Sequence, residues 1–113
     1  MNLKKAAILL SGSLLMTLSG AVVHAAVDEA DAQKLLKDSQ CGKCHDEKRN
    51  KKGPSFKKTA AEYKGKPDAM ALITKNLTEP HEVEVDGEKV EHGAVKTRDA
   101  ARIKNLAEWI LSR

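Results

Sequence analysis

The chain has 113 residues, with 20 Lys and Arg, 16 Asp and Glu, two Cys and a net charge of +4. This length allows a single domain. A chain this short usually needs disulfides, a metal ion or a large cofactor to complete its core. Because Phe56, Tyr63 and Trp109 are its only aromatic residues, we expect a bound group to fill part of the interior.

The first 25 residues have the layout of a secretory signal peptide. The basic start Met1–Lys5 precedes the uncharged segment Ala6–Val23, and Val23-His24-Ala25 has the pattern of a cleavage site. We predict cleavage after Ala25, which makes residues 1–25 the signal peptide and places residues 26–113 in the periplasm. The alternative is a retained membrane anchor, since Ala6–Val23 is about long enough to span a bilayer. No second long apolar run follows, so cleavage excludes stable membrane insertion.

Hydrophobic spacing predicts three helices in the first two thirds of the domain. The first covers Asp28–Gln40 with Asp28 as its N-cap, and the second covers Phe56–Tyr63. The third has Pro67 in its first turn and ends at Pro80. The residues expected on apolar faces are Ala32, Leu35 and Leu36 in the first helix and Met70, Ile73 and Leu77 in the third.

The last third combines a hairpin with a closing helix. Residues alternate over Val83–Val90 around Asp86-Gly87, which is a hairpin signal. Thr97 is the predicted cap of the last helix. Its apolar face comprises Ile103, Leu106, Ala107 and Ile110. The predicted fold class is therefore all-α with one small β-hairpin near residues 83–90.

Residues 41–45, Cys41-Gly42-Lys43-Cys44-His45, form a C-x-x-C-H motif, the attachment signature of c-type haem. Two thiols three positions apart on a helical turn can each form a thioether with one vinyl group of the porphyrin, and the adjacent imidazole can bind the iron. We therefore predict one covalently bound haem c, attached through Cys41 and Cys44, with His45 as the proximal axial ligand.

Other chemistries also use paired cysteines. A thioredoxin-like C-x-x-C needs a βαβ context, which this sequence lacks. A zinc ion needs four ligands, and Cys41, Cys44, His45 and a distant His could supply them. A disulfide across so short a loop would stabilise little. The export signal favours haem, because bacteria attach haem to such motifs on the export side of the membrane.

With these features the chain resembles a small monohaem class I c-type cytochrome over nearly all of residues 26–113. The similar features are a helix leading into Cys41–His45, then Gly53-Pro54 and Phe56, and a closing helix that contains Trp109. The resemblance implies the class I cytochrome c fold, with N- and C-terminal helices that cross at close range and pack around the haem. It also implies that Gly53 and Pro54 lie on the proximal side of the haem, near His45.

The sequence departs from this family at the sixth iron ligand, which is usually a Met in the loop before the last helix. No Met follows Met70, and His92 stands in that loop, so we predict bis-histidine ligation by His45 and His92. The alternatives are Met70, which lies on a core stripe, His81, which follows a helix end, and an open iron. Because Met/His ligation raises the reduction potential, a second imidazole is expected to lower it.

Charge is divided between two segments. Lys43–Lys66 has nine basic and three acidic residues, whereas Glu79–Glu91 has six acidic residues and Lys89. We interpret Lys43–Lys66 as a basic patch that attracts the acidic surface of a redox partner; the alternative is a pair of solvated loops. The export signal and the few aromatic residues disfavour nucleic acid.

These features predict a monomeric one-electron carrier in a periplasmic electron-transfer chain. No acid, base or nucleophile constellation is visible, so we do not expect an enzyme. Two alternatives remain: a ligand-binding or catalytic haem protein with an open or displaceable sixth site, and the cytochrome subunit of an oxidoreductase.

Overall fold

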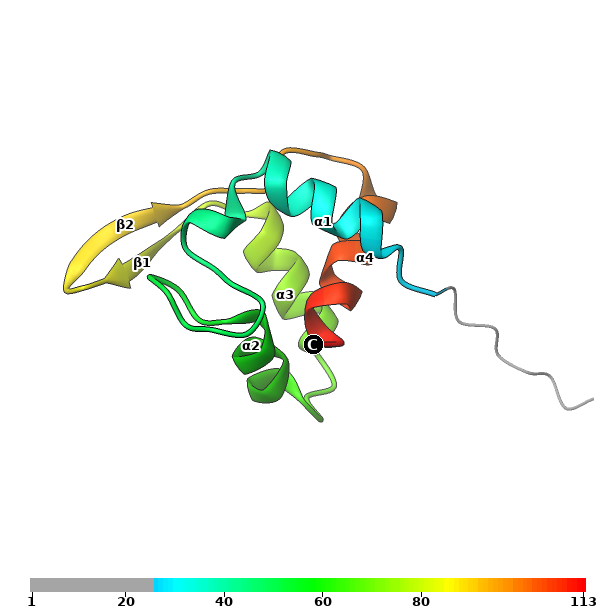
Figure 1. Cartoon of the computed structure of the whole chain (residues 1–113), viewed down its shortest axis with the longest axis horizontal. Coiled ribbons are helices and arrows are strands. Elements are labelled where there is room, and N and C mark those ends of the chain that lie inside the picture. The colour runs from blue at the N-terminus through cyan, green and yellow to red at the C-terminus, as the bar shows by residue number, and fades with distance from the viewer. Residues whose placement is uncertain (1–25) are drawn as a thin grey trace, which may run out of the picture.

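The computed structural model describes residues 26–113, so the predicted signal peptide and its cleavage site lie outside the described residues. The elements in chain order are α1 (Glu29–Asp38), the 3₁₀ turn η1 (Cys41–Lys43), α2 (Phe56–Tyr63), α3 (Ala69–Thr78), β1 (His81–Val85), β2 (Glu88–His92) and α4 (Ala100–Leu111). Figure 1 shows α1 beside α4, with the hairpin projecting at the opposite end of the molecule. Within residues 26–113, no helix is long and apolar enough to cross a membrane.

The first two helices begin at side-chain caps. The Asp28 carboxylate accepts a hydrogen bond from the Asp31 N–H, as predicted, and the Ser55 hydroxyl oxygen accepts one from the Lys58 N–H. Helix α2 has its predicted bounds. Helix α1 ends two residues early, because Gln40 adopts the left-handed conformation (φ 58°) and cannot continue the helix.

The structure corrects two predicted helix starts. Helix α3 begins at Ala69, and Pro67 lies in a preceding turn that the Ala69 N–H closes by donating to the Lys66 carbonyl. The cap of α4 is Asp99 and not Thr97. The Asp99 carboxylate accepts two N–H groups of the first helical turn, whereas the Thr97 hydroxyl accepts the Asp99 N–H. A carboxylate is also the better match to the positive end of the helix dipole.

The hairpin is longer than the predicted range 83–90. Its turn is formed by Asp86 and Gly87, both with positive φ (52° and 82°), as a tight two-residue turn requires. Antiparallel pairing extends outward from this turn until His81 faces His92. Because directly opposed residues share one face of a sheet, these two histidines lie on the same side of the hairpin.

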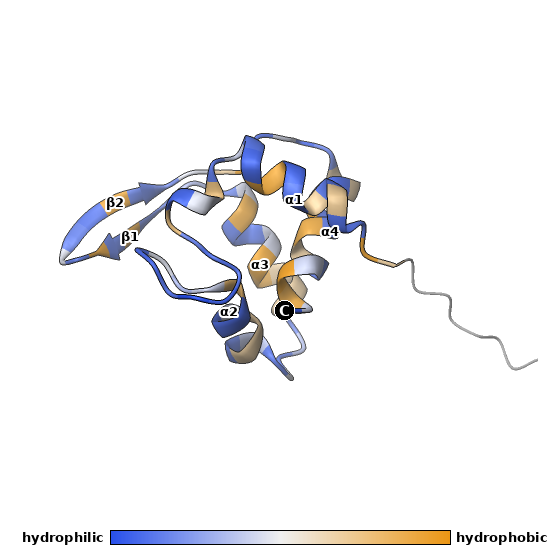
Figure 2. Ribbon diagram, in the orientation of Figure 1, coloured by the Kyte–Doolittle hydropathy of each residue, from blue (hydrophilic) through white to orange (hydrophobic). Residues whose placement is uncertain are grey.

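The core lies where α1 crosses α4, with α2 and α3 packed against α4. Its buried side chains are Ala32, Leu35, Leu36, Phe56, Ile73, Leu77, Val95, Ile103, Leu106, Ala107, Trp109 and Ile110. The predicted apolar faces are thus confirmed, except that Met70 is only partly buried at the edge of this core. Figure 2 shows hydrophobic segments on α1, α3 and α4, whereas the hairpin is largely hydrophilic.

Arg113 connects three segments around this core. Its guanidinium carbon lies 4.3 Å from the centre of the Trp109 ring. Its terminal nitrogens lie 3.4 Å from a carboxylate oxygen of Glu29 in α1 and 3.3 Å from one of Glu47, which follows the C-x-x-C-H motif. This side chain therefore joins α4 to α1 and to the segment that carries the motif.

We expect Arg113→Ala to destabilise the protein by about 1 kcal/mol, because a cation–π contact and two half-exposed ion pairs are lost. For a domain of this size, the melting temperature should fall by about 4–8 °C in a thermal unfolding experiment. Lys104→Ala is the control, since Lys104 on the preceding helix α4 makes one exposed ion pair with Glu108. Equal effects of the two variants would contradict the role of Arg113.

Candidate functional site

The C-x-x-C-H motif begins with the 3₁₀ turn η1, and a hydrogen bond back to the start of that turn fixes the backbone of His45. The His45 N–H donates to the Cys41 carbonyl at 2.9 Å. On the ring, Nδ1 lies 2.7 Å from the Pro54 carbonyl oxygen. Because a carbonyl only accepts, Nδ1 carries the proton, and in the neutral ring Nε2 then has the lone pair. This is the tautomer and the second hydrogen bond that a metal-binding histidine usually has.

Gly53 and Pro54 pack against the same ring, as the family resemblance implies. A Cβ atom on Gly53 would lie 2.5 Å from Cε1 of His45, so only glycine allows this close approach. The Gly53 N–H donates to the Cys44 carbonyl at 2.8 Å, which ties this segment to the motif. The Phe56 ring stacks on His45 with centres 5.4 Å apart and an interplanar angle of 23°. Backbone and aromatic contacts together hold the imidazole in place.

His92 lies across from this imidazole, at the end of β2. The centres of the His45 and His92 rings are 6.1 Å apart, with an angle of 67° between the ring planes. Imidazoles on opposite sides of one metal ion have centres about 6 Å apart, since each metal–nitrogen bond is about 2 Å and each ring centre lies about 1 Å further. The fold therefore brings together two residues that are 47 positions apart in the sequence, at a spacing that one iron ion can bridge.

The surroundings of His92 disfavour protonation of its ring. Burial lowers the pKa of His92, and repulsion by the neighbouring His81 and His45 rings, whenever these are protonated, acts in the same direction. Its Nδ1 atom is buried and has no hydrogen-bond partner among residues 26–113. A buried polar atom in this state is costly unless a bound group completes its surroundings.

The two other sixth-ligand candidates lie in different places. The His81 ring stacks on His92, with centres 4.7 Å apart and an interplanar angle of 26°. Met70 packs at the edge of the helical core and does not line the cavities that border His45. The structure thus brings His45, His92 and His81 together and leaves Met70 apart.

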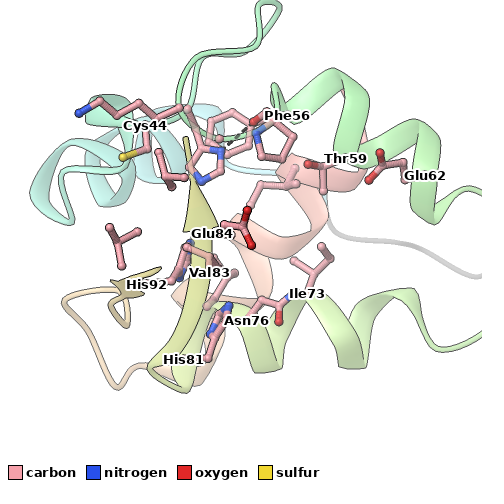
Figure 3. Close-up of a pocket in the computed structure, with 18 of the residues that line it drawn as sticks. Cys44, Phe56, Thr59, Glu62, Ile73, Asn76, His81, Val83, Glu84 and His92 are labelled. Carbon is pink, nitrogen blue, oxygen red and sulfur yellow. Dashed lines mark hydrogen bonds between the residues drawn. The ribbon is translucent and has the colours of Figure 1, made fainter. Parts of the chain in front are cut away.

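Two cavities border the His45–His92 pair. The larger, of about 340 Å³, is also lined by Cys44, and the smaller, of about 60 Å³, by Cys41. Phe56, Leu77 and Ile110 line both. Figure 3 shows the larger cavity, with His92, His81 and Val83 of the hairpin across from Cys44 and Phe56.

These residues fit a haem c. Both cysteines are free, and one lies at each cavity. Burial raises the pKa of the Cys41 thiol, which keeps it protonated. The apolar walls and the facing imidazoles supply the low-polarity surroundings and the nitrogen donors that such a group requires.

Sequence reasoning missed some of the residues that surround this site. Thr59, Tyr63 and Asn76 line the larger cavity with polar groups. The three polar residues come from α2 and α3, and only the packing of these helices places them together. Phe56 is identified from the sequence as a feature that follows Gly53-Pro54, but the sequence does not predict its stack on His45.

The model of the Cytochrome c family matches residues 29–113, so the chain belongs to this family. The structure of the class 1 cytochrome MtoD from Sideroxydans lithotrophicus ES-1 is 38% identical, with a TM-score of 0.71 over 77% of this chain and 97% of that one. Cytochrome c552 from Nitrosomonas europaea is 26% identical, with a TM-score of 0.57 over 71% of this chain and 96% of that one. No curated protein matches the chain.

These relationships confirm the predicted monohaem class I c-type cytochrome and its fold. Membership of the family implies one covalently bound haem c, and Cys41 and Cys44 are the two cysteines present for thioether attachment. The family also indicates electron transfer. It decides against the thioredoxin-like and zinc interpretations of the motif.

We expect Gly53→Ala to destabilise the haem-loaded protein by about 1–3 kcal/mol, because the new methyl group overlaps the His45 ring and must displace it from Pro54. The haem absorption spectrum should change as well, since the imidazole moves. Gly42→Ala is the matched control, because a Cβ at Gly42 meets no atom within 4 Å. An unchanged melting temperature and spectrum for Gly53→Ala would show that this close approach does not hold His45.

Proposed function

We propose that this protein is a one-electron carrier of a periplasmic electron-transfer chain, with the iron of its haem c held between His45 and His92. The observation that carries the proposal is the 6.1 Å separation of these two imidazole rings within a cytochrome c fold. The bound haem supplies the one-electron chemistry by cycling between ferric and ferrous iron. In this proposal residues 1–25 direct export and are removed after Ala25.

The protein's own residues bind and orient the haem. Cys41 and Cys44 attach it covalently, and His45 presents Nε2 because Pro54 accepts the Nδ1 proton. This hydrogen bond also strengthens His45 as an electron donor to iron. His92 supplies the second imidazole from the other side. Apolar side chains exclude water, which limits the reorganisation that accompanies a change of charge at the iron.

Ligation by two imidazoles sets the chemical character of the carrier. Met/His ligation raises the reduction potential of c-type haems, so replacing the thioether by a second imidazole lowers it. With both axial positions filled by protein, the iron has no free position for a substrate. These points support a carrier with a lower potential than that of Met/His relatives, rather than an enzyme.

We expect His92→Ala to convert the low-spin haem into one with high-spin features, because its sixth ligand is lost. The reduced variant should bind CO rapidly, whereas the parent protein should resist CO. Met70→Leu conserves side-chain volume and should leave both the spectrum and the CO resistance unchanged. If the haem stays low-spin in His92→Ala but becomes high-spin in Met70→Leu, the sixth ligand is Met70. Rapid CO binding by the parent protein would favour a ligand-binding haem protein.

We also propose that the basic patch Lys43–Lys66 steers acidic partners to the haem. Lys52 lines the larger cavity together with Glu62, Glu84 and Glu91, so part of the positive charge borders the site itself, next to carboxylates. Charge beside a redox centre raises the rate of encounter with partners of opposite sign. Residues 26–113 together have only a small net charge. The attraction therefore depends on the clustering of lysines in the basic patch and not on the charge of the whole domain.

Lys52→Glu tests the steering role with two small redox probes of opposite charge, ferricyanide and hexaammineruthenium. Oxidation of the ferrous protein by ferricyanide should slow about two- to fivefold at low ionic strength, and reduction of the ferric protein by the cation should accelerate. High salt should remove most of the difference. Lys104→Glu on α4, which does not line the cavity, is the charge-matched control. Equal effects of the two substitutions would show that the total charge of the protein sets these rates, and not the position of Lys52 beside the cavity.

A further inference from the structure

We infer that His81 is a positioning residue that holds the His92 imidazole in its iron-binding orientation by ring stacking. The inference rests on the proposed ligation of iron by His92. It assigns to His81 a role other than that of an axial ligand.

The hairpin places the two histidines in register. His81 is the first residue of β1 and His92 is the last of β2, and they are directly paired. Directly opposed side chains in an antiparallel sheet are close neighbours on one face. The next pair on that face, Val83 and Val90, lies further along the hairpin. The histidines therefore lie at the end of the hairpin that joins the body of the protein.

The two rings stack rather than touch edge to edge. Their centres are 4.7 Å apart, and their planes differ by 26°. This separation lies within the range of stacked aromatic pairs. The plane of the His92 ring is steeply inclined to the plane of the His45 ring but only slightly inclined to the plane of the His81 ring. One face of the His92 ring is thus covered by His81, and this contact restricts its rotation.

The orientation of His81 is itself fixed from α3. Its Nδ1 donates a hydrogen bond to the Glu79 carbonyl at 2.9 Å. The Glu79 N–H in turn donates to the Lys75 carbonyl of α3 at 2.9 Å, and Pro80 restricts the backbone between Glu79 and His81. A rigid connection therefore runs from the end of α3 through His81 to the ring of His92.

His92 needs this support because it lacks the hydrogen bond that fixes His45. The Pro54 carbonyl holds His45, whereas Nδ1 of His92 has no partner among the described residues. The strand that carries His92 belongs to a two-stranded sheet, which is only marginally stable alone. On the outer face, Glu82 lies directly opposite Glu91, a like-charge pair that weakens the hairpin further.

The test compares His81→Ala with His81→Phe in the haem-loaded protein, because phenylalanine keeps a flat ring and removes the nitrogens. CO can bind the reduced haem only after His92 leaves the iron, so the CO association rate reports how firmly His92 is held. We expect His81→Ala to accelerate CO binding about two- to tenfold, the range that corresponds to the loss of one ring stack. His81→Phe should stay close to the parent rate. Both variants should remain low-spin in the ferric state.

Lys89→Ala removes the exposed ion pair between Lys89 and Glu82 on the outer face of the hairpin, so it controls for general loosening and should leave the CO rate near that of the parent. The inference is overturned if His81→Ala leaves the CO rate unchanged, or if His81→Phe accelerates it as much as His81→Ala. It is also overturned if both His81 variants become high-spin while His92→Ala stays low-spin, because His81 would then be the iron ligand and the proposed ligation by His92 would fail as well. If His92→Ala is high-spin, His92 remains the ligand, and the CO rates of the two His81 variants alone decide the inference.

Discussion

The separation of two imidazole rings, on His45 and His92, is the constraint on which the rest of the structure depends. The rings come from the C-x-x-C-H turn and from the end of a hairpin, and their centres are 6.1 Å apart. Holding them apart leaves two cavities that both rings line, and a domain with three aromatic residues cannot fill that space from its own side chains. The crossing of α1 and α4 supplies the rigid base, and Arg113 connects that base to the segment after the motif. The bound haem therefore completes the core as well as providing the redox centre.

The two histidines are held by different means, and the difference bears on function. A carbonyl hydrogen bond and a close glycine fix His45, which directly follows the two cysteines present for thioether attachment. His92 depends on an exposed hairpin and on its stack with His81. Under the proposed ligation by His45 and His92, a carrier needs both imidazoles to stay bound through reduction and oxidation. How firmly His92 is held then decides whether the iron only transfers electrons or also binds external ligands. Small changes around His81 would be enough to shift this balance.

The sequence predicted the parts of the molecule that local chemistry determines. The spacing of Cys41, Cys44 and His45 identified the cofactor, Asp28 identified the start of α1, and apolar periodicity identified the core faces. Local patterns misplaced the cap of α4, because both Thr97 and Asp99 can cap a helix and only the geometry decides between them. The stack of His81 on His92 could not be read from the sequence, since it depends on pairing at the open end of the hairpin, beyond the predicted range. The same is true of the polar residues that α2 and α3 bring to the cavity.

The most direct test of this account is the electronic absorption spectrum of the exported, haem-loaded protein with its natural sequence, extended into the red for the ferric form and followed by addition of CO to the ferrous form. Ligation by His45 and His92 predicts low-spin spectra in both oxidation states, no methionine–iron charge-transfer band, and no rapid change on addition of CO. A methionine–iron band would contradict the account by assigning the sixth position to Met70. High-spin features with ready CO binding would contradict it as well, because they would leave the sixth position open.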